Sequence, residues 1–219
     1  MVNLGDQLPN FKANTTQGNI EFHSWLNGKW GILFSHPDDY TPVCTTELGR
    51  AAKLAPEFEK RGVKLIGLSC NSASSHSGWI KDIEAYSSLS GQFPFPIIAD
   101  EKRELAVQLG MLDPDEKDSA GLPLTCRAVF IVDQNAKLKL SLLYPATTGR
   151  NFDEILRVVD SLKLTVEKKV ATPVDWKAGD KCMVIPSVKA EDIPKLFPKG
   201  VEIANVPSGK QYIRLTPQP

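Results

Sequence analysis

The residue whose type and position could do the most chemistry is Cys44, which lies between an apolar run at residues 30–34 and a helical pattern that extends to residue 60. Thr41 is a favourable N-cap, and Pro42 suits the first helical position because proline has no N–H to leave unbonded there. Cys44 is therefore predicted in the first turn of a helix. Unpaired backbone N–H groups and the helix dipole favour a thiolate over a thiol at that place, and the thiolate is the nucleophilic form.

The immediate neighbours of Cys44 oppose this activation, because Asp38, Asp39 and Glu47 are all acidic. Negative charges close to a thiol disfavour its ionisation unless a cation compensates for them. Arg127 is our candidate for that cation. It stands at the edge of the apolar run 128–132, where an unpaired guanidinium would be unfavourable. The alternative is that Arg127 is an ordinary solvated surface residue.

Length and charge limit the class of protein. The chain has 219 residues, with 26 basic and 26 acidic side chains and a net charge of +0. This balance gives no electrostatic reason to expect nucleic acid or an anionic membrane as a partner. The first residues have neither a basic segment nor an apolar one, and the apolar runs are too short to cross a bilayer. We therefore expect a cytoplasmic protein without integral membrane association.

The four cysteines are scattered, and no pair has the spacing of a zinc site. We expect no metal, no other cofactor and no disulfide framework. Cys70 and Cys126 border apolar strands, so we interpret them as buried and inert. The role of Cys182 is left open.

Hydrophobic periodicity predicts an α/β protein with a parallel strand pair joined by a helix. A polar stretch at residues 113–121 is predicted to be a surface loop, and a proline-rich tail of short segments follows the last long helix. The predicted strands are residues 30–35, 63–69, 97–99, 127–132 and 137–143, and the predicted helices are residues 43–60, 75–86, 101–109 and 151–162.

The pattern Pro37-x-x-x-Thr41-x-x-Cys44 resembles the active-site motif of peroxiredoxins, and the longer stretch at residues 35–50 is similar to their one-cysteine branch. Residues 93–98, 144–157 and 170–176 resemble further blocks of the same family. The resemblance implies a thioredoxin-like fold at residues 1–165, with a mixed central sheet flanked by helices. It also implies a small C-terminal α+β domain at residues 166–219 and a homodimer formed by edge-to-edge strand pairing.

The resemblance further implies a thiol-dependent peroxidase that reduces hydrogen peroxide and organic hydroperoxides through a sulfenic acid on Cys44. Such chemistry needs a thiolate to attack one peroxide oxygen, and donors to stabilise the charge that grows on the departing oxygen. The residues that match the family's site, or that we expect to support it, are Pro37, Thr41, Arg127, Arg150, Glu47 as the group that orients Arg127, and His36, which could equally be structural.

The sequence departs from two patterns of related proteins. Thr172 stands before Pro173-Val174-Asp175-Trp176, where the two-cysteine branch has its resolving cysteine. We therefore expect a one-cysteine cycle with an external thiol, such as glutathione, as the reductant. Relatives in the one-cysteine branch also carry a serine-type phospholipase A2 activity. Here Lys29 replaces its serine and Asn135 its aspartate, leaving only His23, so we expect no such activity.

Two other functions share some of these residues. A peroxide sensor or redox relay would pass oxidation from Cys44 to a partner protein, and its first step would be identical to that of a peroxidase. A cysteine hydrolase would use Cys44 with His36 and form an acyl-enzyme. Sustained turnover with a small thiol would distinguish a peroxidase from a relay, and indifference to peroxide would indicate the hydrolase.

Overall fold

The computed structural model describes residues 2–219. The chain divides into two compact units, one that ends at Phe152 and one from Asp153 to Pro219. The division falls at the start of helix α5 (Phe152–Glu167). The predicted domain boundary at residue 165 lies near the other end of this helix and stays a prediction.

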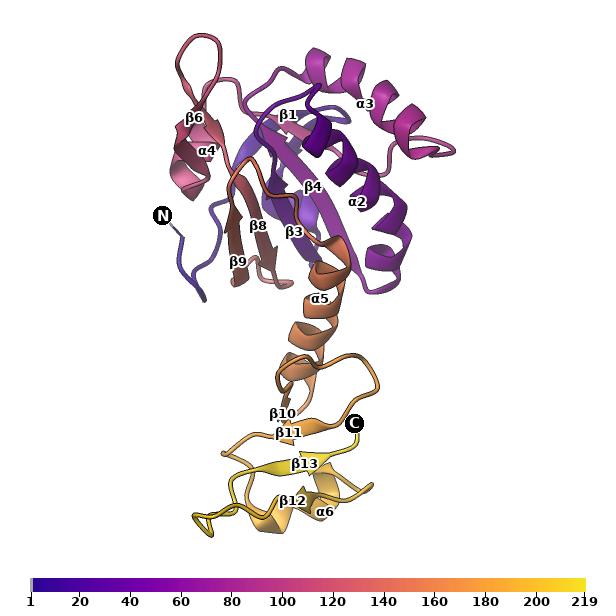
Figure 1. The fold of residues 1–219 in the computed structure, drawn as a ribbon, viewed down its shortest axis with the longest axis vertical. Coiled ribbons are helices and arrows are strands. Elements are labelled where there is room, and N and C mark those ends of the chain that lie inside the picture. The colour runs from indigo at the N-terminus through magenta and orange to yellow at the C-terminus, as the bar shows by residue number, and fades with distance from the viewer. Residues whose placement is uncertain (1) are drawn as a thin grey trace. The chain divides into compact units, whose positions relative to one another are not determined.

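The first unit is built on a seven-stranded sheet with the strand order β2-β1-β5-β4-β3-β8-β9 (Figure 1). The pairs β3–β4 and β4–β5 are parallel and the others are antiparallel, which confirms the predicted mixed sheet. The strands are β1 (Lys12–Thr15), β2 (Gly18–Glu21), β3 (Trp30–Ser35), β4 (Val63–Ser69), β5 (Ile97–Ala99), β8 (Arg127–Val132) and β9 (Leu138–Tyr144).

The centre of the sheet explains why its strands are so apolar. All six residues of β3 and all six of β8 are buried, as expected for strands covered on both faces. Helix α2 (Pro42–Lys60) connects β3 to its parallel neighbour β4. The site of interest therefore begins at the carboxyl end of a central strand, where the chain turns into α2.

Helices cover both faces of this sheet. Helices α2 and α3 (Ala73–Ser87) lie side by side on one face (Figure 1). Gly49 permits their close approach, because a Cβ at this position would collide with the hydroxyl of Ser87 and lie 2.9 Å from its Cβ. Residues of α1 (Phe22–Leu26) and α4 (Glu104–Leu109) belong to the hydrophobic cluster that packs on the other face.

The prediction of a loop at residues 113–121 is wrong for most of that stretch. Strand β6 (Leu112–Lys117) pairs antiparallel with β7 (Pro123–Thr125) in a separate two-stranded ribbon. Its residues are exposed or half-buried, and Pro114 lies within it. A ribbon held mainly by backbone hydrogen bonds gives no hydrophobic alternation, which is the signal on which strand prediction depends.

The second unit contains most of α5 and a small four-stranded antiparallel sheet with the order β10-β11-β13-β12. Trp176 and Cys182 are central to its hydrophobic cluster. Its other elements are β10 (Val170–Ala171), β11 (Cys182–Val184), a short 3-10 helix (Ala190–Asp192), α6 (Ile193–Leu196), β12 (Glu202–Ile203) and β13 (Arg214–Thr216). The predicted small α+β unit at the C-terminus is thus confirmed.

Among residues 2–219, none of the helices combines the length and the apolar composition needed to cross a membrane.

Candidate functional site

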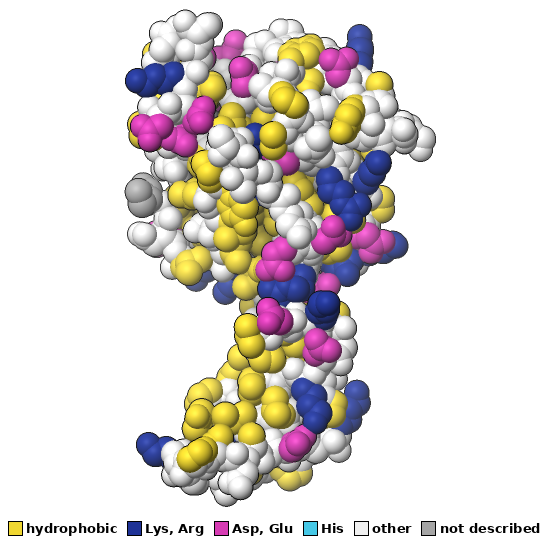
Figure 2. Space-filling view, viewed as in Figure 1, with side chains coloured by type: hydrophobic (Ala, Val, Ile, Leu, Met, Phe, Trp, Pro, Cys, Tyr) yellow, Lys and Arg dark blue, Asp and Glu magenta, His cyan; other side chains and the backbone are white. Residues whose placement is uncertain are grey.

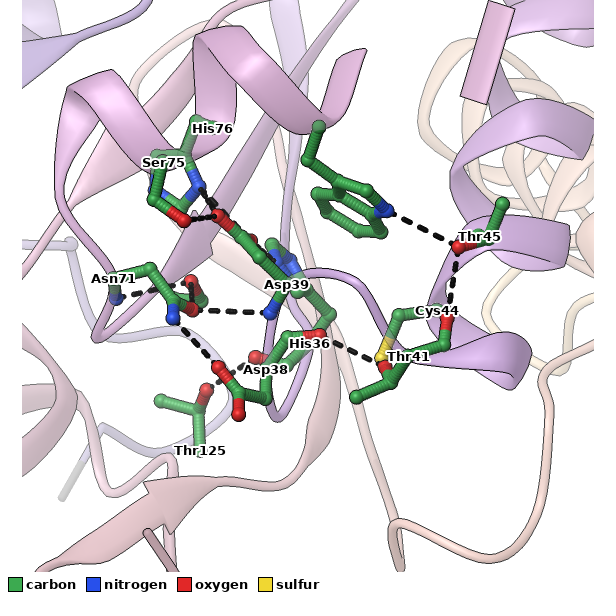
Figure 3. Close-up of polar contacts among 12 residues, drawn as sticks. His36, Asp38, Asp39, Thr41, Cys44, Thr45, Asn71, Ser75, His76 and Thr125 are labelled. Atoms are coloured by element: carbon green, nitrogen blue, oxygen red, sulfur yellow. Dashed lines mark hydrogen bonds and ion pairs between the residues drawn. The ribbon is translucent and has the colours of Figure 1, made fainter. Parts of the chain in front are cut away.

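Cys44 lies in the first turn of α2 and has no exposed surface. Thr41 occupies the N-cap with extended dihedrals (φ −110°, ψ 148°), and Pro42 is the first helical residue, as predicted. The side chain of Thr41 does not cap the helix. Its hydroxyl instead donates to the carbonyl of Asp38 at 2.9 Å (Figure 3). The first N–H groups of α2 thus remain free of intrahelical partners near the sulfur.

Arg127 brings a positive charge to Cys44 from the first position of β8. Its Nη1 donates to the Cys44 Sγ at 3.4 Å and to a carboxylate oxygen of Glu47 at 2.7 Å. Its Nε and Nη2 both donate to the carbonyl of Ala146, at 3.0 and 2.6 Å. The arginine is only 2% exposed. Four hydrogen bonds therefore fix the guanidinium against the sulfur.

Glu47 is shared by two arginines. Besides Arg127, it binds Arg150 through the backbone N–H at 2.6 Å, Nε at 2.9 Å and Nη2 at 2.7 Å. Burial alone would raise the pKa of Glu47, but the hydrogen bonds and charge of Arg150, together with the charge of Arg127, hold it below its usual value. Two guanidinium groups and one carboxylate leave one net positive charge in this buried cluster, and Arg127, which belongs to it, contacts the sulfur of Cys44.

His36 and Asp39 form a second buried cluster with His76 of α3 (Figure 3). The carboxylate of Asp39 contacts His36 Nε2 at 2.8 Å and His76 Nδ1 at 2.8 Å. Burial lowers the pKa of His36. Burial alone would raise the pKa of Asp39, but hydrogen bonds from the two histidines lower it strongly. Asp39 is therefore compensated locally and does not oppose the charge on Cys44.

The same three side chains place possible ligand atoms within 4.8 Å of one another. The Asp39 carboxylate already bonds one ring nitrogen of each histidine, so hydrogen bonding explains the arrangement without an ion. The predicted absence of a metal site stays a prediction.

The loop between β3 and α2 is held at several points. The His36 carbonyl accepts from the Thr125 hydroxyl at 2.6 Å, and the Asn71 amide donates to the Asp38 carboxylate at 2.6 Å. The backbone N–H of Asp39 donates to the other end of the Asn71 amide at 3.2 Å. Pro37, within this loop, is buried.

The structure brings four of the predicted residues into direct contact, namely Cys44, Glu47, Arg127 and Arg150, with Thr41 at the helix cap beside them. His36 belongs instead to the cluster around Asp39. Sequence reasoning missed His76 and Asn71 as members of the site. They lie more than 30 positions from the loop that they hold, as the separations of 32 and 37 residues show, and no motif marks them.

The three other cysteines differ from Cys44 in their surroundings. Burial raises the pKa of Cys70 to about 11, and it also raises the pKa of Cys126 and Cys182. A raised pKa keeps each of these groups as a thiol, which is a poor nucleophile. No cation contacts them as Arg127 contacts Cys44 among the hydrogen bonds of the described residues.

Comparison with known protein families matches both parts of the chain. The model of the AhpC/TSA family matches residues 4–141. The model described as the C-terminal domain of 1-Cys peroxiredoxin matches residues 161–198.

Relatives and solved structures agree with these matches. The chain is 67% identical to peroxiredoxin-6 of Gallus gallus and 65% identical to that of Homo sapiens, each over 99% of this chain and 97% of the relative. A cysteine-to-serine mutant of peroxiredoxin 6 of Arenicola marina superposes with a TM-score of 0.98 at 61% identity, covering 100% of this chain and 99% of that one. A yeast mitochondrial 1-Cys peroxiredoxin, studied for thiol resolution through glutathione/thioredoxin systems, has a TM-score of 0.87 at 39% identity, covering 99% and 100%.

Proposed function

Because this chain belongs to the peroxiredoxin family, in its one-cysteine branch, and is a thiol-dependent peroxidase, we propose that Cys44 is the residue that attacks the hydroperoxide. The observation that carries this assignment is the contact between Arg127 Nη1 and Cys44 Sγ at 3.4 Å. It joins a cysteine in the first turn of α2 to a buried guanidinium, and both features stabilise a thiolate.

In the proposed reaction the thiolate sulfur forms a bond to the terminal oxygen of R–O–OH, and the O–O bond breaks. The electron pair leaves on the RO oxygen, which takes a proton and departs as ROH, and Cys44 becomes a sulfenic acid. Arg127 and the free N–H groups of the first turn would stabilise the developing charge. The Thr41 hydroxyl donates its hydrogen bond to the backbone carbonyl of Asp38, so its oxygen is left to accept a hydrogen bond from the hydroperoxide.

Glu47 and Arg150 are positioning residues in this proposal. Glu47 accepts one hydrogen bond from Arg127 and three from Arg150, and Arg150 Nη1 also donates to the carbonyl of Ala128 in β8 at 2.7 Å. The pair therefore links α2 to β8. Without this link the Arg127 guanidinium would be held only by its two hydrogen bonds to the Ala146 carbonyl and its contact with Cys44.

Stopped-flow measurement of the reduced chain with hydrogen peroxide tests the assignment. We expect Cys44→Ser to abolish the rapid phase, and Arg127→Ala to slow it by roughly 10²–10³-fold, as for the loss of one preorganised donor. Arg50→Ala, on the exposed side of the same helix, is the matched control and should react like the unmodified chain. A reaction no faster than that of free cysteine, or one that survives Cys44→Ser, would refute the assignment.

We propose that an external thiol, such as glutathione, reduces the sulfenic acid. Thr172, at the place of a resolving cysteine, has only a hydroxyl, which bonds Ser161 at 2.7 Å. Sustained peroxide consumption with glutathione would support this cycle. A stoichiometric disulfide between Cys44 and Cys182, found by mass spectrometry after one equivalent of peroxide, would contradict it. A cytoplasmic location suits the cycle, because that compartment supplies reduced thiols; cell fractionation tests it.

We also propose a homodimer formed through β9. This strand is at the edge of the sheet, and beyond Leu138, whose backbone groups pair with residues 5 and 6, its outer backbone groups can pair with a second strand. Leu143 is 59% exposed, and Leu140 and Leu142 are only half-buried. Figure 2 shows hydrophobic side chains on the visible face of the first unit, over the region that Figure 1 labels β8 and β9. Analytical ultracentrifugation should give twice the chain mass and Leu143→Asp a shift toward monomer, whereas a monomer of the unmodified chain at micromolar concentration would exclude this proposal.

A further inference from the structure

One buried carboxylate, that of Asp39, collects three polar side chains that take no part in the contacts of Cys44 (Figure 3). It accepts from the Ser75 hydroxyl at 2.7 Å and contacts one ring nitrogen each of His36 and His76, both at 2.8 Å. Both histidines have no exposed surface, and Asp39 is 5% exposed. The hydrogen-bond partners of these ring nitrogens, and not solvent, therefore determine which of them carry hydrogen.

The partners of His76 determine its protonation. Its Nδ1 faces the Asp39 carboxylate, and its Nε2 faces the carbonyl oxygen of Ile98 at 3.2 Å. A carboxylate and a carbonyl can only accept hydrogen bonds, so each ring nitrogen must supply a hydrogen. His76 therefore carries hydrogen on both nitrogens and forms a buried ion pair with Asp39.

The partners of His36 lead to the opposite state. Its Nε2 faces the same carboxylate and must donate, whereas its Nδ1 is buried and has no hydrogen-bond partner among the described residues. Burial lowers the pKa of this imidazole, and the positive charges of His76 and Arg150 act in the same direction. His36 is therefore neutral, with its hydrogen on Nε2 and a lone pair on Nδ1.

We propose that Asp39 and His76 are positioning residues that hold His36 in its Nε2–H tautomer, so that the bare Nδ1 can accept a hydrogen bond from hydrogen peroxide, which has a second O–H besides the one directed at Thr41. This role rests on the proposed function of Cys44. Buried acceptors without a partner are uncommon in proteins, which indicates that a donor arrives during the reaction. The ring of His36 lies 5.0 Å from that of Trp79, whose N–H donates at 3.1 Å to Thr45, the residue after Cys44.

Nitrogen NMR of the reduced, histidine-labelled full chain tests the tautomers without any activity measurement. At neutral pH we expect His76 to show two protonated ring nitrogens, and His36 to show a protonated Nε2 and a bare Nδ1. His23, whose ring contacts the carbonyl of Leu8 at 2.8 Å, provides an internal reference. A bare nitrogen on His76, or a hydrogen on Nδ1 of His36, would overturn the inference and leave the role of Cys44 intact.

A double-mutant cycle tests whether Asp39 acts through His36. Asp39→Asn should slow the reaction with hydrogen peroxide by at least about tenfold, toward the lower end of what positioned acid–base groups contribute. His76→Asn keeps a donor toward Asp39 but loses the charge, and should have a similar effect. His36→Gln keeps a donor toward Asp39 but has no counterpart of Nδ1. In that background Asp39→Asn should change the rate by less than about twofold, because the two residues act as a unit.

Equal losses from Asp39→Asn in both backgrounds, or no loss in either, would refute the positioning role. Asp82→Asn, at an exposed position of α3, is the matched control for the chemical change.

The two proposals fail in different ways. Rapid peroxide reduction by the Cys44→Ser variant would contradict the proposed function, whereas an inactive Cys44→Ser variant together with an additive cycle would contradict only the positioning role.

Discussion

Replacing Glu47 by glutamine should damage both the stability of the fold and the site. The carboxylate is 3% exposed and accepts four hydrogen bonds, one from Arg127 and three from Arg150. Glutamine has one oxygen in place of two, and its amide would point N–H groups at arginine donors. It also leaves two buried guanidinium groups, 2% and 8% exposed by residue, without a counter-charge.

Removing one partner of a buried ion pair typically costs about 3–5 kcal/mol, because the remaining charge stays buried. We expect Glu47→Gln to lower the free energy of unfolding by an amount in this range, measured by urea denaturation, and to slow the reaction with peroxide. Glu59→Gln, exposed on the same helix, should change the stability by less than about 0.5 kcal/mol. A loss below about 1 kcal/mol for Glu47→Gln, with an unchanged peroxide rate, would refute this account of the cluster.

Three further predictions concern helix packing, acid stability and lipid hydrolysis. Gly49→Ala should destabilise the chain by about 1–3 kcal/mol, because the new Cβ meets Ser87 on the adjacent helix; thermal unfolding would measure this, and an unchanged midpoint would show that α2 and α3 can separate at no cost. Because burial lowers the pKa of His36, the unfolded chain binds more protons below about pH 6.5, and the free energy of unfolding should fall as the pH drops below that value. In His36→Gln the free energy of unfolding, measured by urea denaturation at a series of pH values, should fall less steeply just below pH 6.5. The same pH profile in the variant and the unmodified chain would show that other groups cause the decline. With Lys29 at the place of a serine nucleophile, vesicles should yield no lysophospholipid by serine-type hydrolysis; release that persists in Cys44→Ser would contradict this.

Local rules were sufficient to predict where the reactive cysteine lies. Thr41 and Pro42 indicated the start of α2, and the apolar run before them indicated β3; both elements have the predicted bounds to within a residue. The need for a cation followed from the acidic neighbours of Cys44. Arg127 could be selected because a charged residue at the edge of a buried strand requires a partner and because it matches an arginine of the family's site, and the structure places it against the sulfur.

The remainder of the site depends on long-range contacts that no local pattern encodes. Asp39 was counted as a charge opposing Cys44, but His36 and His76 compensate for it. His76 comes from a different helix, and nothing in its own sequence neighbourhood distinguishes it from a surface histidine. The Thr41 hydroxyl donates to the backbone carbonyl of Asp38 at 2.9 Å instead of capping α2, and the N-cap preference of threonine does not indicate this.

The shared carboxylate of Glu47 also has a consequence for how the chain acquires its reactivity while it folds. Glu47 meets Arg127 and Arg150 across sequence separations of 80 and 103 residues. Contacts between such distant segments require the closure of long loops, and they are formed slowly compared with local helix. A newly synthesised chain would therefore form α2, with Cys44 in its first turn, before Arg127 and Arg150 come into contact with Glu47. The reactivity of Cys44 toward peroxide, followed during refolding, would then report when the central sheet is complete.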